Sequence, residues 1–367
     1  MADRRRIVIV GAGVVGCAIA RELAMRDVRC TVVDPRYAGG GATQASAGML
    51  APYVEAHAGG PMLDLCVRSL DLYDAWIADV RRDAVALGGR DDIDLPEYGR
   101  IGTLEIALSP ERAAELRGGH GVWMEPSAVA DLVPPLAATA GALRNERHGY
   151  VDPRHLTGAL AESAESRGVT FISARAERID RRGGTHTVDL GPGHSALEAD
   201  AVVLAAGAWT NRILGVRTPP VRPVRGQLLL HWGDIGRIPA ILWGPDCYIV
   251  PRRHPLHLVI GATVEDAGFD ERPTEDGTTR LFEAARRLLP ALEKDAIREV
   301  RVGLRPATPD ELPVLGDDPS EPGVFHASGH YRNGILLAPI TAKLITDLVI
   351  DGRRDPCLEY FRPDRFD

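Results

Sequence analysis

The stretch "RIVIVGAGVVGCAIARELAMRDVRCTVVD", Arg6 to Asp34, decides the fold class of this chain. Its β-branched run Ile7 to Val10 predicts a short strand that is buried on both faces. Apolar residues at helical spacing predict a helix over Val14 to Arg26, and Cys30 to Val33 predicts a second strand. A strand, a helix and a second strand in this order predict a parallel sheet covered by helices.

Three glycines join the first strand to the helix. Gly11, Gly13 and Gly16 stand in the spacing GxGxxG. In a dinucleotide-binding turn the first glycine permits the tight bend, the second admits a pyrophosphate, and the third lets the helix pack on the strand. The free N–H groups at the helix start favour the phosphates. Asp34 follows at the distance where an acid accepts hydrogen bonds from a ribose, which favours NAD(H) or FAD over NADP.

Two further stretches favour FAD. The run of small residues "AGGGATQASAGML", Ala38 to Leu50, would let a longer cofactor approach the backbone, although a flexible surface loop would read the same way. The stretch "ADAVVLAAGAWT", Ala199 to Thr210, predicts a buried strand that ends in Ala206 and Gly207. Small residues at that end of a strand suit a ligand site, and a core strand with a tight turn is the alternative.

Composition limits the remaining possibilities. The 367 residues are 45% hydrophobic and 26% charged, which suffices for two packed domains. A net charge of -8 argues against nucleic-acid binding. The five cysteines include no CxxC pair, so neither a disulfide framework nor a metal site is expected, and reduced cytoplasmic thiols fit best. We expect no membrane partner, because no signal peptide is visible and no apolar run approaches about 18–20 residues.

The rest of the chain predicts two interleaved domains. A long amphipathic helix is expected over Pro61 to Asp83, and a helix capped by Asp152 begins at Pro153. Val224 to Ala262 reads as mostly β, and the C-terminal segment predicts a strand, a turn and a helix with Pro339 in its first turn. The predicted FAD-binding domain comprises residues 1–75, 150–222 and 303–367, and the substrate-binding domain comprises 76–149 and 223–302.

Seven stretches in one order resemble the D-amino-acid oxidase superfamily of flavoproteins, and within it most closely the glycine oxidases of bacterial thiamine biosynthesis. They are "IVIVGAGVVGCAIARELA", "ATQASAGMLAPYVEA", "VDPRHLTGAL", "AVVLAAGAWT", "CYIVPR", "GLRPATPDELPVLG" and "ASGHYRNGILLAPITAKLITDL". The resemblance implies an α/β fold in which a Rossmann-like FAD domain is interleaved with a substrate domain on a mostly antiparallel sheet.

The resemblance also implies the site. Arg305 matches the arginine that grips the substrate carboxylate, Tyr248 matches a tyrosine of the same site, and Arg332 matches an arginine of the flavin-side wall. The expected cofactor-binding residues are Gly11, Gly13, Val14, Val15, Gly16, Asp34, Thr43, Ser46, Ala47, Gly48, Met49, Ala206, Gly207, Trp209, Arg305, His330, Arg332, Asn333, Gly334, Ile335 and Leu336. No cysteine immediately precedes Thr308, where some related enzymes tether the flavin, so we expect FAD to be non-covalent.

The residue types fit this chemistry. An arginine fork binds a carboxylate through two hydrogen bonds and fixes Cα for hydride transfer to flavin N5. A structural salt bridge is the alternative for Arg305, and a solvated loop is the alternative for Arg332. We expect Arg332 at the mouth of a buried segment, with its charge compensated by the ligand.

The implied reaction is the oxidation of glycine, sarcosine or small D-amino acids to an imine. Water hydrolyses the imine to a 2-oxo acid and ammonia, and dioxygen is reduced to hydrogen peroxide. The alternatives are a dehydrogenase of D-, N-methyl or cyclic amino acids that passes electrons to a quinone or carrier, and a redox-inactive flavin-binding protein. The resemblance further implies a cytoplasmic homo-oligomer. The preferred amino acid stays open.

Overall fold

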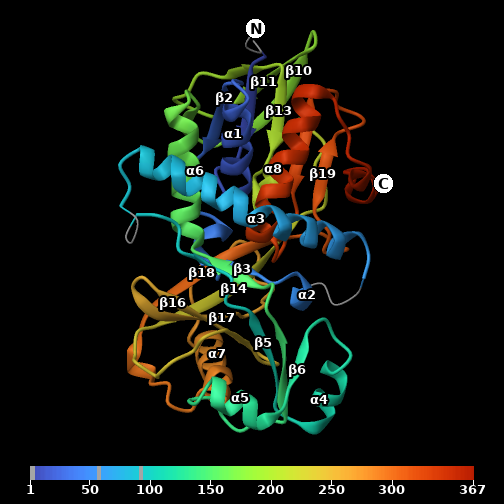
Figure 1. Ribbon diagram of the computed structural model, residues 1–367. Helices are drawn as coiled ribbons and strands as arrows, with labels where there is room; N and C mark the ends of the chain where they lie inside the picture. The colour runs from blue at the N-terminus through green and yellow to red at the C-terminus, as the bar shows by residue number, and fades with distance from the viewer. Residues whose placement is uncertain (1–4, 56–58, 91–93) are drawn as a thin grey trace.

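A computed structural model describes residues 5–55, 59–90 and 94–367. Two large sheets organise this part of the chain, one in the upper and one in the lower half of Figure 1. The upper sheet has the strand order β19 (Val314–Asp317), β20 (Val324–Ser328), β13 (Ala201–Leu204), β1 (Ile7–Val10), β2 (Cys30–Asp34) and β9 (Thr170–Ser173).

β1 lies inside the upper sheet, which explains its run of β-branched residues. It pairs in parallel with β13 on one side and with β2 on the other. Ile7 and Ile9 belong to the hydrophobic core on one face of the sheet, whereas Val8 and Val10 belong to the core on the other face. A strand that is covered on both faces carries apolar side chains at every position.

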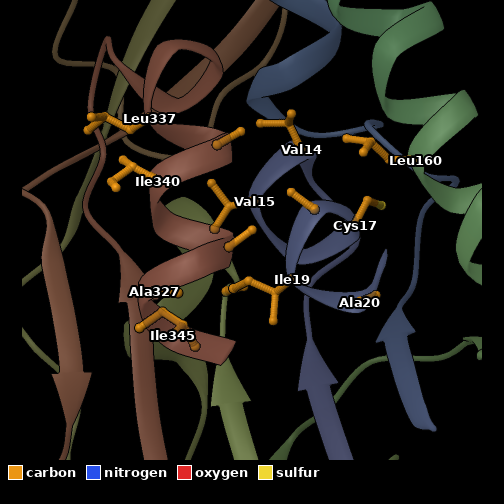
Figure 2. Close-up of a cluster of buried hydrophobic side chains, with 14 of the residues drawn as sticks. Val14, Val15, Cys17, Ile19, Ala20, Leu160, Ala327, Leu337, Ile340 and Ile345 are labelled. Atoms are coloured by element: carbon orange, nitrogen blue, oxygen red, sulfur yellow. The ribbon is translucent and has the colours of Figure 1, made fainter. Parts of the chain in front are cut away.

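Helices cover one face of the upper sheet. α1 (Val14–Met25) packs between α6 (Pro153–Ser166) and α8 (Gly334–Asp351), and α3 (Pro61–Ala86) contacts both α6 and α8. Figure 2 shows Val15 and Ile19 on the side of α1 that faces α8. The other face of the sheet is covered by an antiparallel sheet of β10 (Arg178–Arg182), β11 (Thr185–Asp189) and β12 (Leu197–Ala199).

The lower sheet is mostly antiparallel; only its β15–β5 pairing is parallel within the described residues. One of its faces packs against α5 (Pro126–Leu132) and α7 (Glu275–Leu288), and the other packs against Ala47 and Tyr150. Its strand order is β18 (Ile297–Ala307), β14 (Arg222–His231), β17 (Leu256–Gly261), β16 (Tyr248–Arg253), β15 (Ile241–Trp243), β5 (Thr103–Ala107), β7 (Gly141–Asn145) and β6 (Val122–Met124).

Short elements connect these layers. A small antiparallel sheet lies between the two large ones in Figure 1 and consists of β3 (Met49–Leu50), β8 (Gly149–Val151) and β4 (Tyr98–Gly99). The other short elements are α2 (Pro52–Glu55), α4 (Pro110–Leu116), η1 (Ala42–Ala45), η2 (Gly207–Arg212), η3 (Lys294–Ala296) and η4 (Pro356–Phe361). None of the helices in the described ranges combines the length and hydropathy that a membrane-spanning segment requires.

The predicted fold class is confirmed. The strands of the upper sheet come from the start, middle and end of the chain, and the segments between them supply the mostly antiparallel lower sheet. The predicted cap is also present: the Asp152 carboxylate accepts the N–H of His155 at 2.8 Å, and Pro153 occupies the first turn of α6. The residue boundaries of the two domains stay a prediction.

The start of the last helix was predicted wrongly. α8 begins at Gly334, so Pro339 lies inside the helix and not at its start. Proline lacks the N–H that would bond to the carbonyl oxygen of Ile335, four residues earlier. The Tyr73 hydroxyl of α3 donates to that oxygen at 2.8 Å. A hydrogen bond from a neighbouring helix therefore satisfies the carbonyl, and α8 continues through the proline.

We predict that Tyr73→Phe lowers the free energy of unfolding by about 1–3 kcal/mol, because a buried carbonyl oxygen loses its donor. Urea denaturation measures this change. Tyr360→Phe is the control, since Tyr360 is 59% exposed and its replacement should change stability by less than about 0.5 kcal/mol. In a Pro339→Ala background the helix regains an N–H, so the loss caused by Tyr73→Phe should shrink. An unchanged urea midpoint for Tyr73→Phe would contradict this role.

Candidate functional site

A cavity of about 740 Å³ lies where the carboxyl ends of the upper strands meet the lower sheet. Gly11 after β1, Asp34 at the end of β2 and Gly207 after β13 line it on one side. Tyr248 of β16 and Arg305 of β18 line it from the lower sheet. Ligands of open α/β sheets bind at the carboxyl ends of parallel strands, so this cavity is the candidate site.

The structure brings most of the predicted site residues to this cavity. Those that line it are Gly11, Gly13, Val14, Val15, Asp34, Thr43, Ser46, Ala47, Gly48, Met49, Ala206, Gly207, Trp209, Tyr248, Arg305, His330, Arg332, Asn333, Gly334 and Ile335. Segments that are far apart in the sequence therefore line one cavity. The contacts of these residues with a cofactor or a substrate stay predictions.

Two predicted binding residues do not line the cavity. Gly16 faces the turn, where an added Cβ would lie 1.9 Å from the carbonyl oxygen of Gly11. Its role is close packing of helix and turn. Leu336 is 2% exposed in the core, and its carbonyl oxygen accepts the Ser69 hydroxyl at 2.6 Å. Because α8 starts at Gly334, Leu336 already belongs to the packed helix.

The glycine turn shows which positions require a missing side chain. Gly11 has φ +113°, and an added Cβ would lie 2.4 Å from the carbonyl oxygen of Ala205. At Gly13 the nearest atom to an added Cβ is the Thr43 hydroxyl oxygen at 3.7 Å. The same oxygen accepts the N–H of Val14 at 3.2 Å. Gly11 thus lets two strand ends meet, while Gly13 leaves open backbone toward the cavity.

The start of α1 offers further donors to this space. The carbonyl of Gly13 is the first in the helical ladder and accepts the N–H of Cys17 at 3.0 Å. The N–H groups of Val15 and Gly16 precede that bond and have no acceptor inside the helix. A helix N-terminus of this kind favours phosphate through its free N–H groups and its positive dipole end.

The Asp34 carboxylate stabilises the same turn through hydrogen bonds to backbone N–H groups. One carboxylate oxygen accepts the N–H of Ala12 at 2.8 Å, and the other accepts the N–H of Arg36 at 2.8 Å. Each carboxylate oxygen can accept more than one hydrogen bond, so capacity remains for ribose hydroxyls. Asp34 therefore shapes the glycine turn in addition to its predicted role toward the ribose.

Hydrogen bonds to its carbonyl oxygens stabilise the loop at Ser46–Met49. Gly48 has φ +66°, and its carbonyl oxygen accepts the N–H of Val151 at 2.9 Å. The guanidinium of Arg252, which is 1% exposed, donates to the Ala47 carbonyl at 2.6 Å. This loop forms a rigid wall of the cavity.

Arg305 is the cation at the lower end of the cavity. Its guanidinium donates to the Thr263 carbonyl at 3.0 Å and to the Arg225 carbonyl at 3.4 Å. No carboxylate of the described residues forms an ion pair with Arg305, whereas Arg225 beside it pairs with Glu265. The structure therefore does not support the alternative of a structural salt bridge for Arg305. A half-buried cation in this state suits an anionic ligand.

Aromatic rings form the neighbouring wall. Tyr248 lies directly opposite Trp243 in the β15–β16 pair, and their rings stack with centroids 5.5 Å apart. Both line the cavity. Stacking restricts the Tyr248 ring to the face of the sheet.

The C-terminal turn contributes one exposed and one buried residue. Arg332 lies with its guanidinium 4.9 Å from the ring centroid of Tyr331 and donates to its hydroxyl at 3.2 Å. The residue is exposed and lines the cavity, and the compensation of its charge by a ligand stays a prediction. His330 is buried, its Nε2 lies 3.0 Å from the Thr341 hydroxyl oxygen, and burial lowers its pKa to about 4. His330 is therefore neutral near pH 7.

A comparison with protein families identifies the group to which this cavity belongs. The family described as FAD dependent oxidoreductase (DAO) matches residues 6–348. The chain belongs to this family. Its cofactor is FAD.

Individual relatives of this flavoprotein agree. The bifunctional protein ThiO/ThiG of Synechocystis sp. is 36% identical over 368 residues, which are 98% of this chain and 54% of that protein. The chain thus spans about half the length of this curated relative. The glycine oxidase of Geobacillus kaustophilus is 36% identical over 95% of this chain and 94% of its own length. The crystal structure of glycine oxidase from the same organism has a TM-score of 0.89 at 33% identity and covers 98% of this chain and 99% of that chain.

The residues present fit FAD. The open backbone at Gly13 and the free N–H groups of α1 suit the pyrophosphate, and Asp34 suits the ribose. The wall from Ala42 to Met49 is built largely of small residues, which leaves room for the rest of the cofactor. No group of metal-ligating side chains accompanies them in the described ranges.

Some lining residues of the flavoprotein were not predicted from its sequence. Trp243 carried a usable signal, because Gly244 to Cys247 reads as a hairpin turn that places Trp243 opposite Tyr248. The sequence signal for Arg36 was weaker and consisted only of its position two residues after Asp34. Its guanidinium lies 4.4 Å from the ring centroid of Trp209.

One cysteine bears on how the flavin is held. Cys247 is the cysteine among the described lining residues, and burial raises its pKa to about 12. The thiolate is the reactive form of cysteine, so this thiol is unreactive near pH 7.

We predict that acid precipitation of the yellow holoenzyme releases FAD into the supernatant, measured by absorbance. Colour that stays with the pellet would refute a dissociable flavin.

We predict that Asp34→Ala raises the dissociation constant of FAD by about one to two decades, the loss expected for hydrogen bonds to a charged group. Titration of the apoprotein with FAD measures it. Thermal unfolding of the apoprotein separates the two roles of Asp34, because only its bonds to the N–H groups of Ala12 and Arg36 contribute without cofactor. Asp266, which is exposed, supplies the control variant Asp266→Ala. Wild-type FAD affinity in Asp34→Ala would argue against ribose binding.

Proposed function

We propose that this flavoprotein oxidises glycine and other small amino acids, such as sarcosine and small D-amino acids. Hydride leaves Cα of the neutral amine and gives an iminium ion, which loses a proton to become the imine. Water hydrolyses the imine to a 2-oxo acid and ammonia, and the hydride and the proton together account for the two hydrogens of hydrogen peroxide. Glycine would yield glyoxylate. When bound, FAD supplies the hydride acceptor and passes the two electrons to dioxygen, which forms hydrogen peroxide.

The observation that carries this proposal is the state of Arg305. A guanidinium that is half-buried beside a cavity and lacks a carboxylate partner among the described residues is suited to bind one. Its backbone acceptors, the Thr263 and Arg225 carbonyls, hold the fork in place without neutralising its charge. Two hydrogen bonds from the guanidinium would hold a bound carboxylate in one orientation, and this orients Cα.

The aromatic wall would limit what the carboxylate can carry. Tyr248 and Trp243 stack beside the clamp, so bulky substituents on Cα meet rigid rings. This favours glycine and its small relatives over large amino acids.

We infer that the substrate reacts as a neutral amine. His330 stays neutral near pH 7 and is hydrogen-bonded to Thr341, so it adds no charge to the cavity. The lone pair of the amine then stabilises the developing imine, and the role left to the chain is orientation. The pH dependence of flavin reduction should follow the amine of the substrate.

The names of similar proteins point the same way. They include glycine oxidases and the bifunctional ThiO/ThiG proteins, which support a role in thiamine biosynthesis for this chain. The crystal structure of iminodiacetate oxidase from Chelativorans sp. BNC1, with a TM-score of 0.86 and 26% identity, belongs to an enzyme named for another carboxylate-bearing amine. A cytoplasmic homo-oligomer stays a prediction.

Anaerobic bleaching of the flavin by glycine, sarcosine, D-alanine and D-proline tests the proposal. Bleaching by the small acids followed by rapid recovery in air supports an amino-acid oxidase. Bleaching with slow recovery in air and fast reduction of an added quinone would select the dehydrogenase instead. A yellow protein that no amino acid bleaches would overturn the proposal.

We predict that Arg305→Ala raises the free-energy barrier to flavin reduction by glycine by about 3–5 kcal/mol, because the substrate carboxylate is left unpaired in a desolvated site. Stopped-flow flavin reduction measures it. Arg305→Lys should recover only part of the loss, since lysine keeps the charge but lacks the planar fork.

The matched control is Arg301→Ala. Arg301 lies on the same strand, pairs with Glu299 at 2.7 Å, and does not line the cavity. Its replacement should leave the apparent affinity for glycine unchanged. Methylamine, which has no carboxylate, should be insensitive to Arg305→Ala. Near-wild-type affinity for glycine in Arg305→Ala would show that the clamp lies elsewhere, with Arg332 as the next candidate.

A further inference from the structure

Arg305 and Tyr248 stand on one face of the lower sheet. Tyr248 of β16 lies opposite Gly261 of β17, and Gly261 lies opposite Leu228 of β14. Cross-strand partners share a face, so these residues form one row across the sheet. The strands that carry the row lie side by side in the lower half of Figure 1.

Arg305 belongs to the same face through its register with β14. It lies opposite Val224, and Gly226 follows Val224 by two positions on that strand. Residues two apart on a strand point to the same side. Gly226 and Gly261 are therefore both on the cavity side of the sheet, next to Arg305 and Tyr248.

The two long side chains lie across these glycines. A Cβ added to Gly226 would lie 2.2 Å from Nη1 of Arg305 and 2.4 Å from its Cζ. A Cβ added to Gly261 would lie 2.3 Å from both Cζ and Oη of Tyr248. Carbon atoms in contact are about 3.5–4.0 Å apart, so neither side chain could keep its place over an alanine.

We infer that Gly226 and Gly261 are positioning residues that set the orientation of the Arg305 guanidinium and the Tyr248 ring for the substrate. This inference rests on the carboxylate clamp proposed above. The glycines form a floor on which both groups lie flat against the sheet. Any larger residue would lift them into the cavity, where the substrate has to fit.

The location of the overlap decides what a substitution would change. At Gly226 and Gly261 the obstructing atoms are the ends of side chains, which can move. At Gly11 the obstructing atoms are backbone, which cannot move without separating strands. Neither Gly226 nor Gly261 has a φ in the left-handed region, so φ does not exclude alanine at either position. Gly226→Ala and Gly261→Ala should therefore displace the site groups and leave the fold intact.

The effect on binding should be large because the clamp is directional. The Arg305 fork bonds to Thr263 at 3.0 Å in its present place, and lifting it off Gly226 by about 1 Å breaks that bond and tilts the fork. A displacement of about 1 Å at a positioning group can reduce reactivity by about 100-fold. Acetate, which offers the carboxylate without the amine, isolates this step.

The test is a double-mutant cycle on the FAD-loaded enzyme, with acetate titrated at constant ionic strength and followed by the flavin absorbance. Gly226→Ala should raise the dissociation constant of acetate by about 10- to 100-fold. In an Arg305→Ala background the same substitution should change it by less than about twofold, because the group it displaces is gone. Gly261→Ala should likewise lower the rate of flavin reduction by glycine, and Tyr248→Ala should abolish that additional effect.

The control variant is Gly158→Ala in α6, where an added Cβ meets no atom within 4 Å. It should bind acetate as the wild type does. The FAD content and the near-ultraviolet circular dichroism of each variant show whether it has folded. If Gly226→Ala does not fold, the rates of flavin reduction of Gly261→Ala in the wild-type and Tyr248→Ala backgrounds test the inference instead.

The outcomes separate the two proposals. Wild-type acetate affinity in Gly226→Ala, or a loss that persists in the Arg305→Ala background, would overturn the glycine floor while the clamp stands. Wild-type acetate affinity in Arg305→Ala would overturn the clamp itself, and the floor with it.

Discussion

The whole site depends on a backbone contact that only glycine permits. Gly11 donates its N–H to Val33 at 2.8 Å and lies so close to the Ala205 carbonyl that no side chain fits between them. This contact brings the ends of β1, β2 and β13 to one point. The open backbone at Gly13 and the carboxylate of Asp34 face the same space only because the three strand ends converge. A side chain at Gly11 would separate the strands and displace the nucleotide-binding wall.

Features with a local cause could be predicted from the sequence. The strand, turn and helix at the start of the chain follow from β-branched residues, glycine spacing and helical periodicity, and the structure has them at nearly the same residues. The start of α8 could not be predicted in this way. Proline stops a helix unless something else satisfies the carbonyl, and here the donor is Tyr73, 262 positions away in the sequence. A local pattern holds no information on such a partner.

Some features of the site could likewise be predicted from the sequence, and others depend on contacts between distant segments. The resemblance to flavoproteins predicted that Arg305 and Tyr248 line one cavity, and they do. It did not indicate what lies beneath them, because the strand register decides which glycine faces which side chain. Gly226 and Gly261 look in the sequence like ordinary strand glycines. The contact of the Arg332 guanidinium with the Tyr331 ring was not predicted either.

The interleaved order of the chain has a consequence for biosynthesis. β20 pairs with β13, and α8 covers α1, so the dinucleotide-binding unit made from the first residues is completed by Val324–Ser328 and Gly334–Asp351. A ribosome adds about 5–20 residues per second, so the first βαβ unit waits about 15 to 60 s for its partners. During that interval the side of α1 with Val15 and Ile19 lacks its cover. The dinucleotide-binding unit is therefore complete only after the residues up to Asp351 have been synthesised.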